Sequence, residues 1–150
     1  MKSITIREFF DSKKKDLALS LITEPQTLDK KLGSPHINRP GLALAGYLDV
    51  FSSECFQVFG EVEVRYLQSL QEDLMLDRAR AIFKLDIPCI IVTKGLTFPP
   101  ALEYLANDLN IPILSSRLST IQLIQQLTRH LQFIFAMEKT IHATLIDVFG

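Results

Sequence analysis

Two polar segments of the sequence contain residue types suited to holding a small anion. The turn Lys94-Gly95-Leu96-Thr97 follows the apolar run at residues 89–93, and Ser115-Ser116-Arg117 follows the apolar run at residues 112–114. Backbone amides, hydroxyl groups and the charges of Lys94 and Arg117 could bind an anion there. The alternative is that both segments are ordinary turns between strands and helices.

No familiar catalytic motif accompanies these segments. Gly41 and Gly46 have the glycine spacing of a phosphate loop, but Tyr47-Leu48 stands where lysine followed by serine or threonine is required. The sequence has neither the helical zinc motif His-Glu-x-x-His nor the nucleophile motif Gly-x-Ser-x-Gly. The histidines and cysteines have no spacing typical of metal ligands: His36, His130, His142, Cys55 and Cys89. We therefore predict no metal site, and a small hydrolase would lack its nucleophile and base.

Length and composition favour one ordinary globular domain. The chain has 150 residues, of which 47% are hydrophobic and 22% are charged. Sixteen basic and seventeen acidic residues give a net charge of −1, which argues against nonspecific binding of nucleic acid. Cys89 lies in an apolar run, as a buried reduced thiol would. Without a secretory signal or a run of about 20 apolar residues, we expect a cytoplasmic protein that does not enter a membrane.

The segments that must position these residues alternate between strand-like and helical patterns. Helical spacing predicts one or two short helices in residues 6–22 and further helices in 61–85, with a break near Gln71. Another helix is expected from Pro99-Pro100 to Asn110. The last helix begins at a capping box formed by Ser119 and Gln122. Strands are expected at residues 56–59, 89–93, 112–114 and 141–149. Strands separated by helices predict a layered α/β domain with a mostly parallel sheet flanked by helices. Ligands of such open sheets bind at the carboxyl ends of the strands, where Lys94 and Arg117 would lie.

The segment Asn38-Arg39-Pro40-Gly41-Leu42-Ala43-Leu44-Ala45-Gly46-Tyr47 strongly resembles the N-terminal domain of bacterial HPr kinase/phosphorylase. The resemblance continues through Phe56-Gln57-Val58-Phe59-Gly60 and Ile87-Pro88-Cys89-Ile90-Ile91-Val92-Thr93-Lys94-Gly95. It ends with Ile141-His142-Ala143-Thr144-Leu145-Ile146-Asp147-Val148-Phe149-Gly150. These blocks follow the family's order over nearly the whole chain. They imply the fold of that domain, which is similar to the uridine-nucleotide-binding N-terminal domains of the MurE and MurF ligases.

The resemblance also implies a function. Enzymes of this family use ATP and Mg²⁺ to phosphorylate a serine of the phosphocarrier HPr, remove that phosphate by phosphorolysis, regulate carbon metabolism in this way, and form hexamers. Their chemistry belongs to a C-terminal domain whose phosphate loop would follow residue 150. The resemblance therefore implies an N-terminal α/β domain at residues 1–138 and the first strand of the kinase domain at residues 139–150.

We accordingly expect a noncatalytic chain without a cofactor of its own, whose partner HPr binds the absent domain and whose longer form is a homo-oligomer. The resemblance assigns an active-site role to His142, only in that longer protein, although Ala143 replaces the glycine usual after this histidine. The alternative is a small-ligand-binding or regulatory module that uses Lys94 and Arg117.

Overall fold

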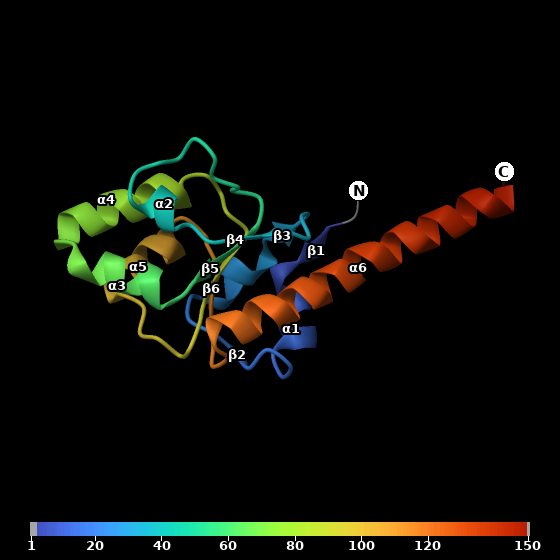
Figure 1. Ribbon diagram of the computed structural model, residues 1–150, viewed down its shortest axis with the longest axis horizontal. Helices are drawn as coiled ribbons and strands as arrows, with labels where there is room; N and C mark the ends of the chain where they lie inside the picture. Colours follow the sequence, from blue (N-terminus) through green and yellow to red (C-terminus); the bar gives the residue numbers. More distant parts are fainter. Residues whose placement is uncertain (1–2, 150) are drawn as a thin grey trace.

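A five-stranded sheet forms the centre of the molecule (Figure 1). The computed structural model describes residues 3–149, with side chains described as far as Ala136. The strand order is β2-β7-β6-β5-β4. Four strands run parallel, and β2 joins the edge antiparallel to β7, which confirms a mostly parallel sheet. The strands are β2 (Leu19–Leu21), β4 (Ile37–Asn38), β5 (Phe56–Phe59), β6 (Cys89–Val92) and β7 (Ile113–Ser116).

The neighbouring strands β5 and β6 are buried along their whole length, because helices cover both faces of the sheet. Successive side chains of β6 point to opposite faces, so Ile90 and Val92 belong to one core while Cys89 and Ile91 belong to the other. The layers are therefore helix, sheet and helix, with a separate hydrophobic core on each side.

The first face carries four helices. They are α2 (Gly41–Leu44), α3 (Glu61–Ser69), α4 (Glu72–Phe83) and α5 (Pro100–Asp108). The predicted break near Gln71 is confirmed. Ser69 and Glu72, three residues apart as in a capping box, do not form one, since Ser69 Oγ donates to the carbonyl oxygen of Tyr66 at 2.6 Å. Gln71 is the N-cap residue that precedes α4, and its backbone is extended.

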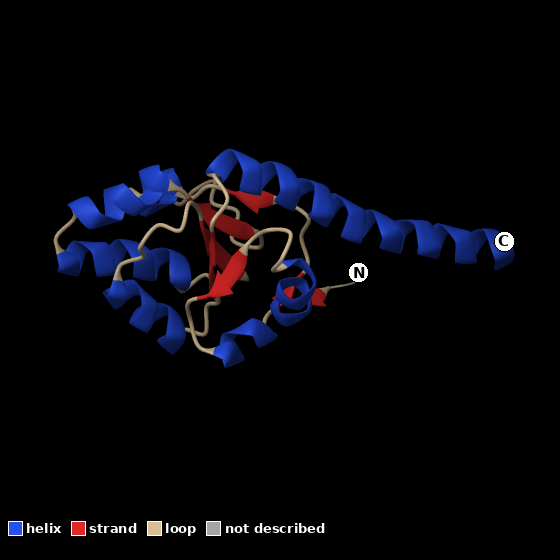
Figure 2. Cartoon of the chain, turned by 90° about the horizontal axis from the view of Figure 1, so that it is seen from below, coloured by secondary structure: helices blue, strands red, loops and turns tan. Residues whose placement is uncertain are grey.

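The second face carries α1 (Ile6–Lys13) and α6 (Thr120–Phe149), as Figure 2 shows from below. A 3₁₀ turn η1 (Pro25–Asp29) and a small sheet of β1 (Ile4–Thr5) and β3 (Lys31–Leu32) complete this layer. The predicted capping box at the start of α6 is confirmed by two hydrogen bonds of 3.2 Å between Ser119 and Gln122. Leu123, Leu127 and Leu131 form the buried stripe by which α6 packs on the sheet.

Two expectations about secondary structure are wrong. The second half of residues 6–22 is not helical, because Leu19–Leu21 pairs with β7 as β2. Residues 141–149 are not a strand but the last turns of α6, which projects beyond the sheet in both views (Figures 1 and 2). Ile141, Leu145 and Val148 have helical spacing, whereas Ile146 and Val148 are two residues apart as on one face of a strand. A helix satisfies its backbone hydrogen bonds without a neighbouring strand.

The division of the chain at residue 138 stays a prediction. In the described part of the chain, no helix has both the length and the apolar character needed to cross a membrane.

Candidate functional site

The carboxyl ends of the parallel strands meet at one edge of the sheet, as the alternating pattern predicts. The turn after β6 lies against the end of β7, because the amides of Lys94 and Gly95 donate to the carbonyl oxygens of Leu118 and Ser116, both at 2.9 Å. Lys94 and Gly95 are consecutive left-handed residues, with φ of 60° and 61°. The turn thus uses both amides for internal hydrogen bonds, so neither is available to hold an anion.

The charged side chains at this edge have other neighbours. Lys94 Nζ lies 3.2 Å from Glu61 Oε2, and Arg65 pairs with Glu61 Oε1 at 2.9 Å. The hydrogen bond from Lys94, followed by the charge of Arg65, holds the pKa of the Glu61 carboxyl below its usual value. Ser116 Oγ donates to the carbonyl oxygen of Leu17 at 2.6 Å, and Arg117 is exposed.

Among the described residues, no hydrogen bond or ion pair joins the side chains of Lys94 and Arg117. Anion binding by this pair stays a prediction.

An ion pair that the sequence did not reveal connects β4 to α3 at the same edge. Arg39 donates through Nε and Nη2 to the two oxygens of Glu63, at 3.0 and 2.7 Å. Glu63 is buried, and its Oε1 also accepts the amide of Gly60 at 2.9 Å, which caps α3. The sequence contained one sign of this arrangement: Glu63 is three residues after Gly60, which precedes the predicted helix. A glutamate at this position can accept hydrogen bonds from the free amides at the start of a helix.

Because Gly60 has no side chain, the start of α6 and the side chain of Arg39 can lie close to the carboxyl end of β5. A Cβ atom on Gly60 would lie 2.8 Å from Thr120 Oγ1 and 3.0 Å from Arg39 Nη2. The hydroxyl groups of Thr120 and Thr93 are 2.7 Å apart. The end of β5, the end of β6, the arginine after β4 and the start of α6 are therefore in direct contact, which fixes α6 relative to β4.

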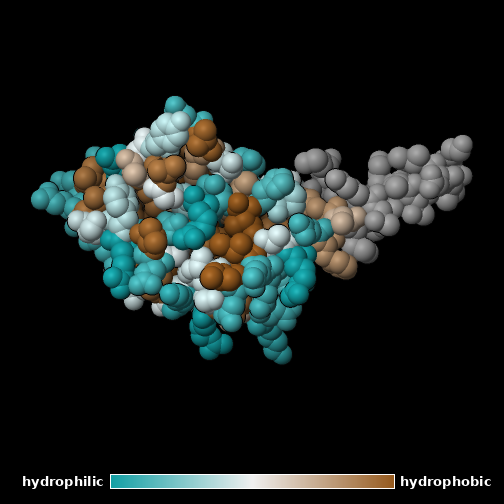
Figure 3. All heavy atoms as spheres, viewed as in Figure 1, coloured by the Kyte–Doolittle hydropathy of each residue, from teal (hydrophilic) through white to brown (hydrophobic). Residues whose placement is uncertain are grey.

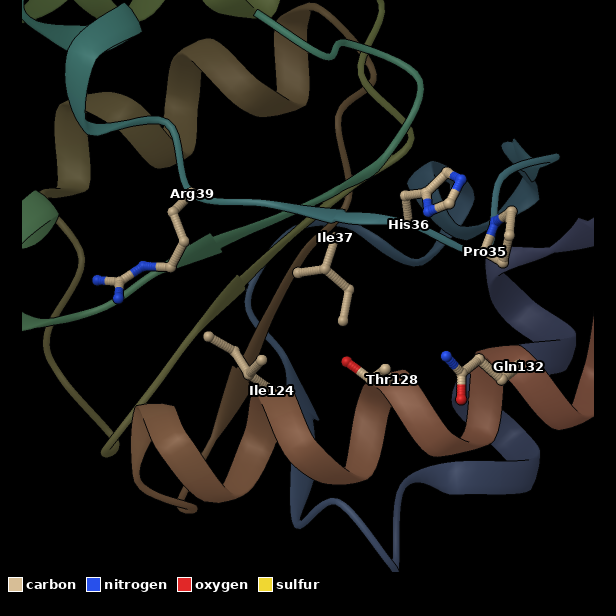
Figure 4. A pocket seen from close by; sticks show the side chains of 7 residues that line it. All are labelled: Pro35, His36, Ile37, Arg39, Ile124, Thr128 and Gln132. Atoms are coloured by element: carbon tan, nitrogen blue, oxygen red, sulfur yellow. The ribbon is translucent and has the colours of Figure 1, made fainter.

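A groove lies between the edge strand β4 and the flank of α6 (Figure 4). Its cavity volume is about 290 Å³. It is lined on the strand side by Pro35, His36, Ile37 and Arg39, and on the helix side by Ile124, Thr128 and Gln132. Figure 3 shows hydrophobic surface on the face where β4 and α6 lie, bordered by polar residues.

The polar side chains of the groove have unused hydrogen-bonding capacity. In the described part of the chain, the hydroxyl of Thr128 and the amide of Gln132 make none of the hydrogen bonds that the structure contains, and the imidazole of His36, which Figure 4 shows on the far side of the strand, makes none either. Ile37 and Ile124 are partly buried at the margin of the α6-side core and form the apolar walls. This combination of apolar walls and a few polar groups is typical of ligand sites, and the volume is at the small end of their range.

The histidines lie apart from one another. His142 belongs to the distal part of α6, and its side chain lies outside the described residues, so its predicted role stays a prediction. His130 is half-buried on α6, where burial, followed by the charge of Lys13, lowers its pKa. His36 is exposed at the groove. Among the side chains described, no three histidine, cysteine or acidic residues are close enough to hold a metal ion.

Comparison with known proteins decides the family of this chain. The profile of the family described as "HPr Serine kinase N terminus" matches residues 4–131. The chain belongs to this family. The match covers both layers of helices and ends at Leu131, the last residue of the buried stripe of α6.

Curated relatives carry the name HPr kinase/phosphorylase. The chain is 34% identical to the HPr kinase/phosphorylase of Alkaliphilus metalliredigens over 150 residues, which are 100% of this chain and 47% of that protein. Identity is 31% with the protein of Brevibacillus brevis, over 88% of this chain and 42% of the relative. Identity is 30% with that of Streptococcus pneumoniae, over 100% of this chain and 47% of the relative. The chain therefore spans less than half the length of these relatives.

A solved structure shares the fold at low sequence identity. It contains the CBS and DRTGG domains of the regulatory region of a Clostridium perfringens pyrophosphatase, complexed with the activator diadenosine tetraphosphate. The TM-score is 0.56 at 12% identity, over 79% of this chain and 45% of the other. This likeness concerns the fold alone.

Proposed function

We propose that this chain serves as the noncatalytic N-terminal domain of a bifunctional HPr serine kinase/phosphorylase. The whole protein would regulate carbon metabolism by phosphorylating HPr with ATP and Mg²⁺ and by removing the phosphate through phosphorolysis. The observation that carries the proposal is the family match over residues 4–131, together with relatives of that name aligned over the whole chain.

The chemistry at the sheet edge supports a noncatalytic role. Phosphoryl transfer requires a phosphate cradle, a metal ion and a base at one place. Here Arg39 is paired with Glu63, and Lys94 is paired with Glu61. These are internal ion pairs between elements of the domain, and they serve to hold the elements together.

The direct test is incubation of this chain with ATP, Mg²⁺ and HPr. We expect no phosphoserine on HPr, whereas the full-length Streptococcus pneumoniae relative in a parallel reaction serves as the positive control. Phosphoserine formed by this chain alone would contradict the noncatalytic role.

His142 would contribute to phosphoryl transfer only in a longer protein, where HPr binds the catalytic domain and the subunits form a homo-oligomer, a hexamer by analogy with the family. In that longer protein, His142→Ala should lower the rates of both kinase and phosphorolysis reactions. Unchanged rates would remove the assignment.

A second candidate is a small-ligand-binding or regulatory module, localised in the cytoplasm with its parent enzyme. The adjacency of the segments after β6 and β7 favours it, since it brings Lys94 and Arg117 to one edge. Titration calorimetry with sugar phosphates is the test. We expect saturable heat that Lys94→Ala or Arg117→Ala abolishes, and a flat titration would exclude sugar phosphates as ligands.

A further inference from the structure

We infer that the groove between β4 and α6 binds an extended segment of another polypeptide, which pairs with the free edge of β4 and carries a carboxylate toward Arg39. This inference concerns a surface that the proposed function does not use. It rests on the free strand edge, on the matched lengths of the two walls and on the charge of the lining.

The edge of β4 is open to a further strand. Among the described strands, β4 pairs only with β5, through Ile37 opposite Phe56 and Asn38 opposite Gln57. A strand at the edge of a sheet presents unpaired amide and carbonyl groups on its outer side. Pro35 has no amide hydrogen, and the amide of His36 already donates to Ser34 Oγ at 3.2 Å. An extended peptide would therefore form its main-chain hydrogen bonds with residues 37–39, while side-chain pockets beside the strand select its sequence.

The two walls of the groove have the same length and run side by side. In Figure 4, the chain from Pro35 to Arg39 lies along the helix from Gln132 back to Ile124. Four residue steps of a strand span about 13 Å. Eight residue steps of a helix span about 12 Å. A groove of this length fits four residues of extended chain.

The side chains that face the groove repeat with the period of each element. Pro35, Ile37 and Arg39 are alternate residues of the strand segment, and Ile124, Thr128 and Gln132 are four residues apart on α6. Figure 4 shows Ile37 pointing toward the helix and Thr128 pointing toward the strand. The groove thus has an apolar section beside Ile37 and Ile124, where a β-branched side chain of the peptide fits.

The charge of the residues that line the groove indicates that a second side chain of the peptide is acidic. No carboxylate lines the groove, whereas the charged side chain of Arg39 closes one end. Arg39 uses Nε and Nη2 for Glu63, and its Nη1 makes no hydrogen bond among those found in the described residues. A peptide carboxylate near this end would accept from Nη1, so an acidic side chain two positions from the β-branched one is expected.

The test is a titration of ¹⁵N-labelled protein with the blocked peptide Ac-Thr-Val-Thr-Glu-Thr-NH₂, followed by amide chemical shifts. We expect shifts confined to residues 35–39 and 124–132, with a dissociation constant of about 0.1 to 1 mM. Replacement of the glutamate by lysine should weaken binding at least about tenfold. Absence of shifts at several millimolar peptide would overturn the inference.

Two protein variants and one modified peptide distinguish strand pairing in the groove from binding of a small molecule or of a second copy of the chain. Thr128→Trp and Gln132→Trp fill the groove and should weaken binding at least about tenfold, whereas Phe133→Trp, exposed on another face of α6 and outside the lining, should not. Gln132 is exposed, so its substitution leaves the fold intact. A peptide with every second amide N-methylated should not bind; equal binding would mean a small-molecule pocket without strand pairing. A dimer of the chain alone that Gln132→Trp dissociates would instead identify a second copy as the occupant.

Discussion

Arg39 and Glu63 are 24 residues apart in the sequence, yet two parallel hydrogen bonds of 3.0 and 2.7 Å join their side chains. The side chain of Glu63 is 4% exposed and that of Arg39 is 42% exposed. The pair links the edge strand to the helix that follows β5. It therefore holds one wall of the groove in place.

The first prediction concerns Glu63. Glu63→Ala leaves the guanidinium of Arg39 and the amide of Gly60 without their acceptor, and should lower the free energy of unfolding by about 2 to 3 kcal/mol. Urea denaturation measures this change. The matched control is Glu61→Ala, whose ion pairs with Lys94 and Arg65 are screened by solvent, so it should lower the free energy of unfolding much less. Equal losses from both variants would contradict a stabilising role for the buried carboxylate.

The second prediction concerns the close approach at Gly60. Gly60→Ala would bring a methyl group within 2.8 Å of Thr120 Oγ1, and the shift of α6 needed to relieve this should lower the free energy of unfolding by about 1 to 3 kcal/mol. Gly33→Ala is the control, because a Cβ atom there meets nothing within 4 Å. Thermal or urea denaturation compares the two. If the Gly60→Ala protein is as stable as the Gly33→Ala protein, a side chain at residue 60 fits without a clash and the prediction is wrong.

The third prediction concerns His130 and pH. Burial, followed by Lys13, lowers the pKa of His130 in the folded state, so the unfolded state binds a proton at higher pH than the folded state. The free energy of unfolding should therefore fall as pH drops below the unfolded value of about 6.5 and level off below the folded pKa. His130→Gln should remove this part of the pH dependence.

Two charge variants check the cause of that pKa. In an NMR titration of the His130 ring, Lys13→Gln should raise the pKa, because the lysine lowers it. Asp16→Asn should lower the pKa further, because the aspartate raises it. Movement of the pKa in the same direction in both variants would mean that these side chains do not act through charge.

The fourth prediction concerns the distal part of α6. A chain that ends after Ala136 keeps Leu123, Leu127 and Leu131, so its free energy of unfolding should stay within about 0.5 kcal/mol of the full chain. Its far-UV circular dichroism at 222 nm should weaken by the contribution of residues 137–149. A shortened chain with unchanged ellipticity would contradict a helix in these residues.

The central sheet could be predicted from the sequence because its signals are local. Cys89–Val92 is a continuous apolar run ended by polar residues, and Ser119 with Gln122 is a capping box in sequence as well as in space. These features need only neighbouring residues to be recognised. The parallel pairing then followed from the alternation of strands and helices.

The remaining parts depend on contacts between distant residues. Leu19–Leu21 has no strand signal of its own and becomes β2 only by pairing with β7. Arg39 and Glu63 were not recognised because a single sequence does not reveal which arginine meets which carboxylate. Residues 141–149 satisfy both periodicities, and the choice between helix and strand depends on whether a neighbouring strand is available.

One continuous helix supplies a wall of the groove and then leaves the domain. With a rise of about 1.5 Å per residue, the axis from Gln132 to Phe149 is about 26 Å long. A tilt of about five degrees at Gln132 would carry Phe149 sideways by about 2 Å over that length. Because α6 runs without a break from the groove to Phe149, a molecule that tilted the helix at the strand edge would displace its far end.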